Sequence, residues 1–338
     1  MMDSPIEADY WAARRQAGLI ELAAWGAIEV RGADRAGFLH RLLTNAIAGL
    51  AEGSGCEAAL TSAAAKLVAH MLVLAEREAH WLLMERVCLS NALNTLAHYV
   101  ITEDVQLRNR SDDIRLLSLQ GPASAKLIEQ ALGIAVQPTM PHHHAAHDVE
   151  GVSVRIVTAS FTGQPGALLI VPTDNAEGIH RRLLNHGEPL GVRSIGEETF
   201  ELLRIEAGLP RYGIEMDEAT LLPETGLETR AVSYTKGCYV GQEVIARMDT
   251  YGSASRKLMG MRCEGSIVPQ PGDPILIDGG TVGQITSAAF SPSLRQPIAL
   301  GYVKRPLYEP GREVTIMRGA STICARLAQG PLVPPERG

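Results

Sequence analysis

The sequence predicts an α+β protein of two or three domains, with a separate β-barrel at its C-terminal end. Its 338 residues exceed the roughly 100–200 residues of one typical domain. Strand-like and helix-like segments mix without the regular alternation of a doubly wound sheet, which favours an α+β fold. After Arg256, short strand-like runs are interrupted by Pro and Gly, and no helical period occurs. This pattern is typical of a small β-barrel or Greek-key module.

The first hundred residues contain clear signals for both kinds of element. We expect a strand at 27–31, a helix at 38–43, a hairpin of strands at 71–74 and 81–84, and a helix at 90–100. Asp34 and Ser90 stand before the helical runs and carry side chains that cap helix N-termini. The charged residues 76–78 separate the two hairpin strands, as a turn does.

A second set of elements follows in the middle of the chain. We expect a strand at 114–119, a helix at 123–132, strands at 152–157 and 167–171, a helix that begins after Asp174 and ends before Gly187, and a helix at 197–207. In the last helix Phe200, Leu203 and Ala207 fall on one stripe, which indicates a buried face. The expected parts are two interwoven subdomains within 1–255 (roughly 1–50 with 145–255, and 51–144), a barrel domain at 256–330 and a frayed tail at 331–338.

Composition and charge exclude several classes of function. Hydrophobic residues make up 46% and charged residues 20%, a balance that excludes wholesale disorder. The chain has 31 Lys and Arg against 38 Asp and Glu, a net charge of −7 that opposes broad binding to nucleic-acid phosphates. No apolar run approaches the ~20 residues that span a bilayer. The polar N-terminus lacks a signal-peptide pattern, so we expect a cytoplasmic protein without membrane contact.

Cysteine and histidine spacing gives no sign of a metal site. The five cysteines form no pattern of a disulfide framework or of a structural zinc or iron–sulfur site, and most are expected to be small buried side chains: Cys56, Cys88, Cys238, Cys263 and Cys324. His142, His143, His144 and His147 lack an acidic or cysteine partner at ligand spacing. We interpret them as a polar loop that binds metal only adventitiously, because a true site needs ordered ligands.

The stretch at 234–243 carries the sharpest chemical signal. Cys238 lies between two glycines, and Lys236 precedes it by two residues. Glycine permits a tight turn, and a nearby ammonium favours the thiolate over the thiol. Gln242 and Glu243 open an apolar run that predicts the first turn of a helix, whose positive end favours the thiolate as well. An inert cysteine at a strand–turn–helix junction is the alternative, and spacing alone favours it.

Two further groups are candidates for ligand binding. Glu206 lies among apolar neighbours before a helix exit; if buried, its two oxygens match adjacent N–H and NH₂ donors of a pterin-like ring. A solvated helix-end carboxylate is the commoner alternative. Arg247, Arg256 and Lys257 are candidates to neutralise an anionic ligand tail such as a polyglutamate, although charges of this kind usually form a solvated face.

The motif K-G-C-Y-x-G-Q-E at 236–243 resembles the signature of YgfZ-type folate-binding proteins. These are relatives of an iron–sulfur assembly factor in the superfamily of the glycine-cleavage T-protein, an aminomethyltransferase. Four other segments resemble superfamily patterns, so that the resemblance covers nearly the whole chain: 30–45, the L-Q-G-P at 119–122, the R-x-E-x-G-x-P-x-Y-G element at 204–213 and the barrel residues 286–303.

The resemblance implies a fold, a ligand and a set of roles. It implies three subdomains in a cloverleaf around a central folate pocket, with a ferredoxin-like middle portion and a C-terminal β-barrel. Tetrahydrofolate or a folate derivative would be the cofactor, and iron–sulfur client enzymes or assembly proteins the partners. The residues implied are Glu206 at the pterin edge, Tyr212, Gln242, Glu243, Arg247 and Arg256 near the ligand, and Cys238 as the working thiol with Lys236 tuning it.

Two departures from the aminomethyltransferase pattern decide which function we expect. His70 stands where those enzymes carry an aspartate that serves folate chemistry, and Glu85 stands where they carry an asparagine. Neither change keeps the same charge and hydrogen-bonding capacity. We therefore expect a folate-binding factor that supports assembly or repair of iron–sulfur enzymes, including tRNA-modifying ones. A folate-dependent aminomethyltransferase or other one-carbon transferase is the alternative, and a folate-binding module without thiol chemistry is a third.

Overall fold

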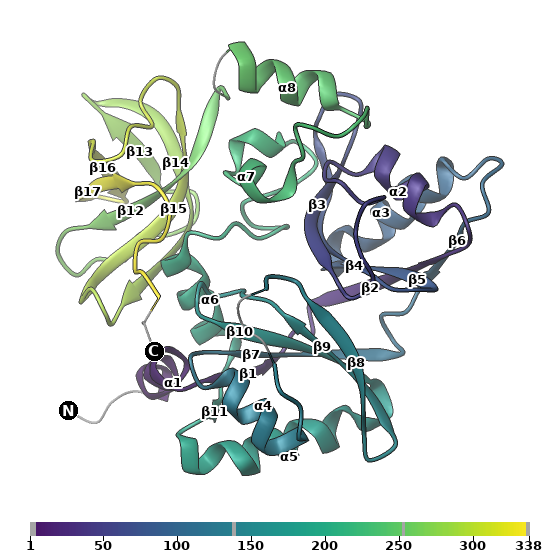
Figure 1. The fold of residues 1–338 in the computed structure, drawn as a ribbon. Helices are drawn as coiled ribbons and strands as arrows, with labels where there is room; N and C mark the ends of the chain where they lie inside the picture. The colour runs from purple at the N-terminus through teal and green to yellow at the C-terminus, as the bar shows by residue number, and fades with distance from the viewer. Residues whose placement is uncertain (1–4, 137–139, 252–253, 336–338) are drawn as a thin grey trace.

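The structure, a computed structural model, describes residues 5–136, 140–251 and 254–335, and its strands form two open sheets and one closed barrel. Figure 1 shows these as three lobes, with the barrel at the left, one sheet at the right and the other below. The helices α6 (Glu197–Ala207) and α7 (Glu228–Ala231) lie between the lobes. The predicted α+β class and the three-lobed arrangement are both present.

The lower lobe is a six-stranded sheet with two helices on one face (Figure 1). Its strand order is β11 (Arg193–Ser194), β1 (Gly18–Glu21), β7 (Ile114–Gln120), β10 (Gly166–Pro172), β9 (Val152–Thr158) and β8 (His144–Val149), and its helices are α4 (Ser124–Leu132) and α5 (Ala176–Gly187). The chain passes from β7 through α4 to β8 and β9, and β10 returns between β7 and β9. This split β-α-β connection is the unit of a ferredoxin-like fold, as expected for the middle of the chain.

The right-hand lobe is a five-stranded antiparallel sheet. Its strand order is β3 (Gly55–Thr61), β4 (Leu67–Ala75), β5 (Ala79–Glu85), β2 (Trp25–Arg31) and β6 (Gln106–Asn109), with helices α2 (Arg35–Leu42) and α3 (Arg86–His98). The predicted subdomain boundaries differ from these sheets. β2 pairs with β5 and β6, because the chain changes sheet between β1 and β2, whereas β7 and α4 belong to the lower lobe.

The barrel begins at the predicted position. The tail that follows it packs against the rest of the molecule. Its order is β12 (Arg256–Cys263), β15 (Gln296–Lys304), β14 (Gly280–Ser291), β13 (Pro274–Ile277), β16 (Glu313–Arg318) and β17 (Ser321–Ala328). The expectation of a frayed tail is wrong for residues 331–335, because Leu332 is fully buried and its N–H donates to the carbonyl of Glu206 at 2.7 Å. Residues 336–338 lie outside the described residues.

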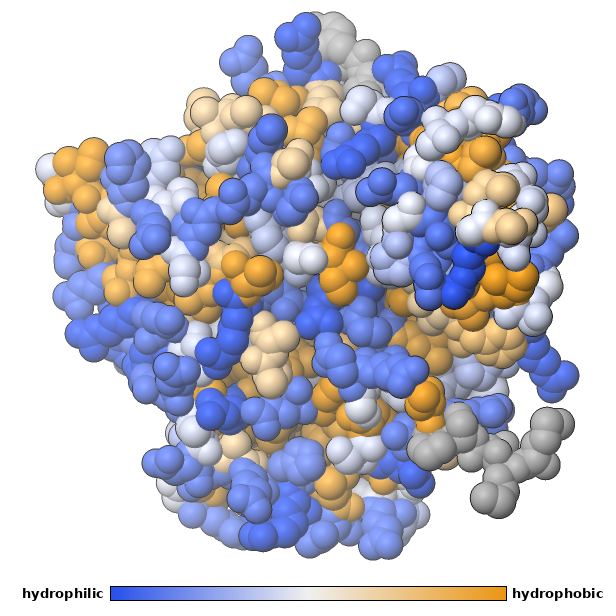
Figure 2. Space-filling model, turned by 180° about the vertical axis from the view of Figure 1, so that it is seen from behind, coloured by the Kyte–Doolittle hydropathy of each residue, from blue (hydrophilic) through white to orange (hydrophobic). Residues whose placement is uncertain are grey.

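The predicted helices occur, but α2 begins at Arg35 rather than at Phe38, and α3 also begins early. α6 has the predicted bounds, and α8 (Gln242–Tyr251) begins where the motif predicts. α3 begins at Arg86 rather than at Ser90, because the chain turns directly from β5 into the helix. None of the helices in the described part of the chain is both long and apolar enough to cross a membrane. Figure 2 shows, on the opposite face, hydrophobic residues in several patches separated by hydrophilic ones.

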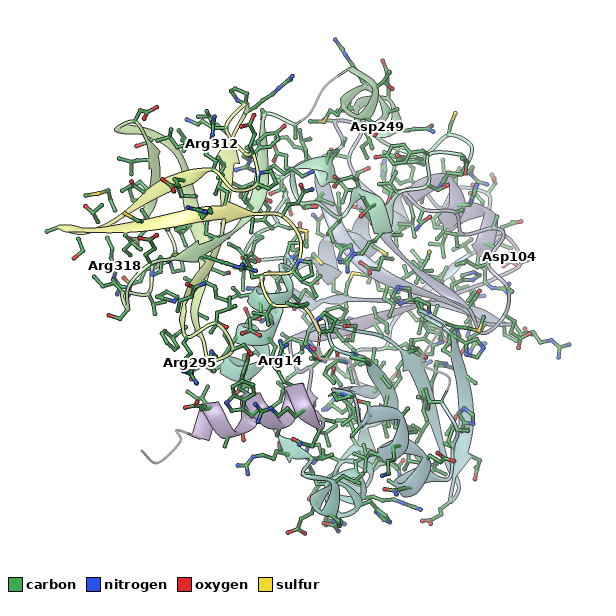
Figure 3. The ribbon with its side chains drawn as sticks, turned by 60° about the vertical axis from the view of Figure 1, so that its left-hand side comes forward. Arg14, Asp104, Asp249, Arg295, Arg312 and Arg318 are labelled. Atoms are coloured by element: carbon green, nitrogen blue, oxygen red, sulfur yellow. The ribbon has the colours of Figure 1, made fainter. Side chains whose placement is uncertain are left out.

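One buried carboxylate connects four segments that are distant in sequence. The side chain of Glu206 on α6 accepts hydrogen bonds from Tyr10 at 2.8 Å and Arg14 at 3.0 Å, both on α1 (Pro5–Arg15), and from Ser291 of β14 at 2.5 Å. Its main-chain carbonyl also accepts the N–H groups of Leu332 and Val333. Figure 3 labels Arg14 beside α1 and the barrel. Glu206 therefore joins α1, α6, the barrel and the C-terminal segment.

Removing this carboxylate is expected to destabilise the protein strongly. Glu206→Ala removes the carboxylate that pairs with the buried Arg14 guanidinium at 3.0 Å, and removing one member of a buried pair typically costs about 3–5 kcal/mol. Urea unfolding followed by circular dichroism measures the change. Glu243→Ala, at an exposed carboxylate on α8, is the matched control and should change the free energy of unfolding by less than about 0.5 kcal/mol. Equal effects of the two substitutions would contradict the assigned role of Glu206.

Candidate functional site

A cavity lies between the two open sheets and is closed by α6, α7 and the segment that joins them. The space inside it is about 80 Å³, smaller than the ~300–1,000 Å³ of typical small-molecule pockets. The lining residues come from both sheets and from the central helices: Trp25, Glu57, His70, Leu72, Glu85, His142, Ala159, Ser160, Phe161, Phe200, Arg204, Leu209, Pro210, Arg211, Tyr212, Met216 and Arg230.

Aromatic rings form much of the cavity wall. Trp25 and Phe161 pack edge to face, with ring centroids 5.1 Å apart and an interplanar angle of 75°. Phe200 comes from α6, and Tyr212 follows that helix and donates its hydroxyl to the carbonyl of Leu67 at 3.3 Å. Flat apolar side chains of this kind suit a planar ring, because they remove its faces from water without leaving polar atoms unpaired.

A second part of the wall consists of ion pairs around Arg211. Its Nε lies 2.8 Å from Oε1 of Glu85, and its NH1 lies 2.6 Å from Glu197 and 2.7 Å from Glu201. Burial raises the pKa of Glu85, and the charge of Arg211 opposes that shift. The neighbouring Arg204 pairs with buried Glu215 at 3.0 Å. These groups supply donors and acceptors at the cavity surface.

In a third part of the wall, three charged or titratable side chains surround one carboxylate. Oε2 of Glu57 lies 3.1 Å from Nε2 of His70 and 3.2 Å from Arg230, and Oε1 lies 3.8 Å from Nε2 of His142. Burial alone would raise the pKa of Glu57. The hydrogen bond and charge of His70, with the charges of Arg230 and His142, instead lower it to about 2. Glu57 is therefore ionised throughout the neutral pH range.

The His-rich segment differs from the expected polar loop. His144 begins strand β8, and His142 has a left-handed backbone, with φ of 59°, and lines the cavity. A left-handed φ is uncommon for residues other than glycine and is often found at functional sites. Burial lowers the pKa of His142, and the charge of Glu57 opposes that shift. Within the described ranges, no cluster of His, Cys, Asp and Glu has the arrangement of a metal site.

The thiol of Cys238 is exposed, and it is not among the residues that line the cavity. The ammonium of Lys236 donates to the carbonyls of His40, Leu43 (2.6 Å) and Asn45 (3.0 Å) and lies 4.9 Å from the ring centroid of Tyr239. Burial lowers the pKa of Lys236 to about 8. The predicted tuning of the thiol by this ammonium does not fit the geometry, because Lys236 holds the end of α2 instead.

The glycine after Cys238 fixes the loop on the edge of the right-hand sheet. Gly241 has φ of 84°, and a Cβ there would lie 2.7 Å from the carbonyl oxygen of Ser62. Thr61 donates its hydroxyl to the carbonyl of Val240 at 2.7 Å. Only glycine permits both this backbone angle and this close approach. The predicted glycine-dependent turn therefore exists, and it holds Cys238 at the surface.

Of the predicted ligand-binding residues, Tyr212 alone is among the described residues that line this cavity. The predicted role of Glu206 at a pterin edge does not fit, because its side chain is 1% exposed and both oxygens accept protein hydrogen bonds. Arg256 pairs with Glu224 at 2.9 Å and lies over the ring of Tyr302. Gln242, Glu243 and Arg247 lie on α8 at the periphery, where Figure 3 labels Asp249.

Several cavity residues carried no signal in the sequence. Glu57, Arg211 and Arg230 lie in separate elements and share no motif spacing. His70 and Glu85, the two positions where the sequence analysis expects departures from the aminomethyltransferase pattern, both line the cavity.

Comparison with known families covers nearly the whole chain. The GCVT N-terminal domain family matches residues 2–236, and the glycine cleavage T-protein C-terminal barrel domain family matches residues 256–334. The boundary between the two agrees with the start of the barrel at Arg256.

The chain is similar to curated aminomethyltransferases along most of its length. It is 28% identical to the aminomethyltransferase of Halothermothrix orenii over 96% of this chain and 90% of that protein. It is 29% identical to the aminomethyltransferase of Symbiobacterium thermophilum over 97% of this chain and 89% of that protein. Both relatives are named aminomethyltransferase, and neither carries a YgfZ name.

The fold is similar to a solved aminomethyltransferase. The crystal structure of glycine cleavage system aminomethyltransferase T from Bartonella henselae superposes with a TM-score of 0.87, at 22% sequence identity, over 98% of this chain and 91% of that chain. This likeness confirms the mixed α+β architecture with its C-terminal barrel. With both family matches together covering most of the sequence, the chain belongs to the glycine cleavage T-protein family.

Proposed function

We propose that the chain binds a reduced folate in the central cavity and supports assembly or repair of iron–sulfur enzymes, including tRNA-modifying ones, through Cys238. Family membership supports tetrahydrofolate as the ligand. The observation that carries the proposal is the cavity itself, which both His70 and Glu85 line. From the sequence motifs we infer that these two residues replace an aspartate and an asparagine of aminomethyltransferases, so that the cavity lacks the transferase carboxylate.

The residues present fit a folate in charge and shape. The rings of Trp25, Phe161 and Phe200 offer apolar surface for a pterin. Carboxylates in the lining, such as Glu85, match the N–H and NH₂ donors of its edge. The half-exposed Arg230 offers a guanidinium for the carboxylates of the glutamate tail. Bound folate would supply a one-carbon carrier or a regulatory signal, whereas the protein groups bind and orient it.

The exposed loop at 236–241 supports a role for the thiol outside the cavity. Lys236 fastens the loop to the carbonyls at the end of α2, and Gly241 packs against residue 62. Cys238 lies between these two attachment points with its side chain exposed. A thiol presented on a fixed loop suits contact with a partner protein, because little conformational entropy is lost when the loop is bound.

Aminomethyl transfer is a second candidate, and the names of the relatives favour it. Aminomethyltransferases match at 28–29% identity over most of the chain. The fold of such an enzyme superposes on the whole chain. The replacement of the aspartate by His70 opposes this candidate, because a neutral imidazole and a carboxylate differ in charge.

Folate binding should depend on Arg230 and not on Arg247. Arg230→Ala removes a cavity guanidinium and should weaken binding of tetrahydrofolate by about tenfold or more, the effect typical of a hydrogen bond to a charged group. Arg247→Ala is the matched control, because this arginine is exposed on α8 and should leave affinity within about twofold. Isothermal titration calorimetry measures both. A loss of affinity confined to Arg247→Ala would place the ligand elsewhere.

The proposed thiol role predicts a selective effect of one exposed cysteine. Cys238→Ala, expressed in a strain that lacks the protein, should fail to restore the activity of iron–sulfur enzymes under oxidant stress. Cys324→Ala is the matched control, because this cysteine is also exposed but lies on β17 of the barrel. Full restoration of iron–sulfur enzyme activity by the Cys238 variant would refute the thiol role. It would not bear on the proposed folate site.

A turnover assay separates the two candidate functions. Purified protein is incubated with tetrahydrofolate and an aminomethyl-carrying lipoyl protein, and methylene-tetrahydrofolate is measured. We expect none, because His70 replaces the carboxylate at the cavity wall. A curated aminomethyltransferase is the positive control. Steady formation of methylene-tetrahydrofolate by this chain would establish the second candidate in place of the first.

A further inference from the structure

The pair of His70 and Glu57 has the geometry of an oriented imidazole. The two side chains come from adjacent antiparallel strands, where Glu57 of β3 lies opposite Leu72 and His70 of β4 lies opposite Ala59. They are therefore diagonal neighbours on one face of the sheet, and Nε2 of His70 lies 3.1 Å from Oε2 of Glu57. Both side chains line the cavity.

The ionised partner determines which nitrogen of the ring carries the proton. A carboxylate accepts hydrogen bonds and donates none, so Nε2 of His70 must be the N–H donor in this pair. In the neutral ring the other nitrogen, Nδ1, is then an acceptor. Catalytic triads hold their histidine through the same kind of carboxylate contact. His70 can therefore receive a hydrogen bond from a molecule in the cavity.

Charged groups from other elements also act on this histidine. Glu57 on β3 favours the protonated ring, whereas His142, before β8, and Arg230 on α7 oppose it when charged. The other charged side chains of the lining are Glu85, Arg204 and Arg211. Arg230 is the cationic group that offsets Glu57, because burial lowers the pKa of His142.

We propose that neutral His70 accepts a hydrogen bond from a ring N–H of a reduced pterin and thereby selects tetrahydrofolate over fully oxidised folic acid. The tetrahydropterin ring carries N–H groups at its two reduced nitrogens, whereas the oxidised ring has bare acceptor nitrogens there. An acceptor on the protein pairs with the first ring and repels the second. A site built to pair with a polar group discriminates against ligands that lack it. This inference rests on the proposed folate site.

The test compares two ligands in four proteins. Tetrahydrofolate and folic acid are titrated by calorimetry under argon at pH 8.0 into the wild type, His70→Leu, Glu57→Gln and His147→Asn. The last is the matched control, because His147 lies on β8 and is outside the lining of this cavity. Nitrogen-15 NMR of the ligand-free proteins reports which imidazole nitrogen is protonated, with His70→Leu assigning the signal.

We expect the wild type and His147→Asn to prefer tetrahydrofolate by about three- to tenfold at pH 8.0, the value of one net hydrogen bond. His70→Leu should abolish the preference. Glu57→Gln should weaken it, because an amide can donate as well as accept and no longer fixes Nε2 of His70 as the donor. NMR should show the proton on Nε2 of His70.

Three results would overturn parts of this scheme in different ways. An unchanged preference for tetrahydrofolate in His70→Leu would refute the selection by His70 while leaving the folate site standing. A proton on Nδ1 in the ligand-free wild type would refute the orientation by Glu57. Binding of neither folate by the correctly folded wild type would refute the proposed function itself, and with it the selection, whatever tautomer NMR reports.

Discussion

The attachment of α1, the barrel and the C-terminal segment to α6 depends on the buried carboxylate of Glu206. Its side chain binds Tyr10 and Arg14 of α1 and Ser291 of the barrel, while its main chain binds the segment at Leu332. Burial raises the pKa of Glu206, and the hydrogen bonds from Ser291 and Tyr10 with the charge of Arg14 oppose that shift. A polar group at this depth is tolerated only when its partners are all in place. These contacts therefore fix α6, which carries one wall of the cavity.

Helix geometry explains why Glu206 is structural although it lies beside the site. Residues two apart on an α-helix point about 200° away from each other. Arg204 therefore faces the cavity and pairs with Glu215, whereas Glu206 faces α1. The predicted stripe of Phe200 and Leu203 could not reveal this, because α6 is buried around nearly its whole circumference. A helix with no solvent face has no periodicity that distinguishes a cavity side from a packing side.

Local signals in the sequence predicted the helices and strands well. Contacts between segments that are distant in sequence could not be predicted from such signals. Hydrophobic period and turn residues placed α6, the hairpin of β4 and β5, and the start of the barrel, because each depends on neighbouring residues. The cluster of Glu57, His70 and Arg230 depends on strand register and on the docking of α7, which no local pattern records. The left-handed backbone of His142 likewise follows from its packing between strands and not from its sequence neighbours.

The loop that presents Cys238 and the wall of the cavity meet at one residue. The main-chain carbonyl of Asn45 accepts a hydrogen bond from Lys236 at 3.0 Å. The side-chain amide of Asn45 donates to the carbonyls of Glu57 at 2.8 Å and Arg230 at 3.1 Å. Asn45 therefore links β3 and α7 to the attachment of the thiol loop. This contact connects the position of the thiol loop with that of the cavity wall.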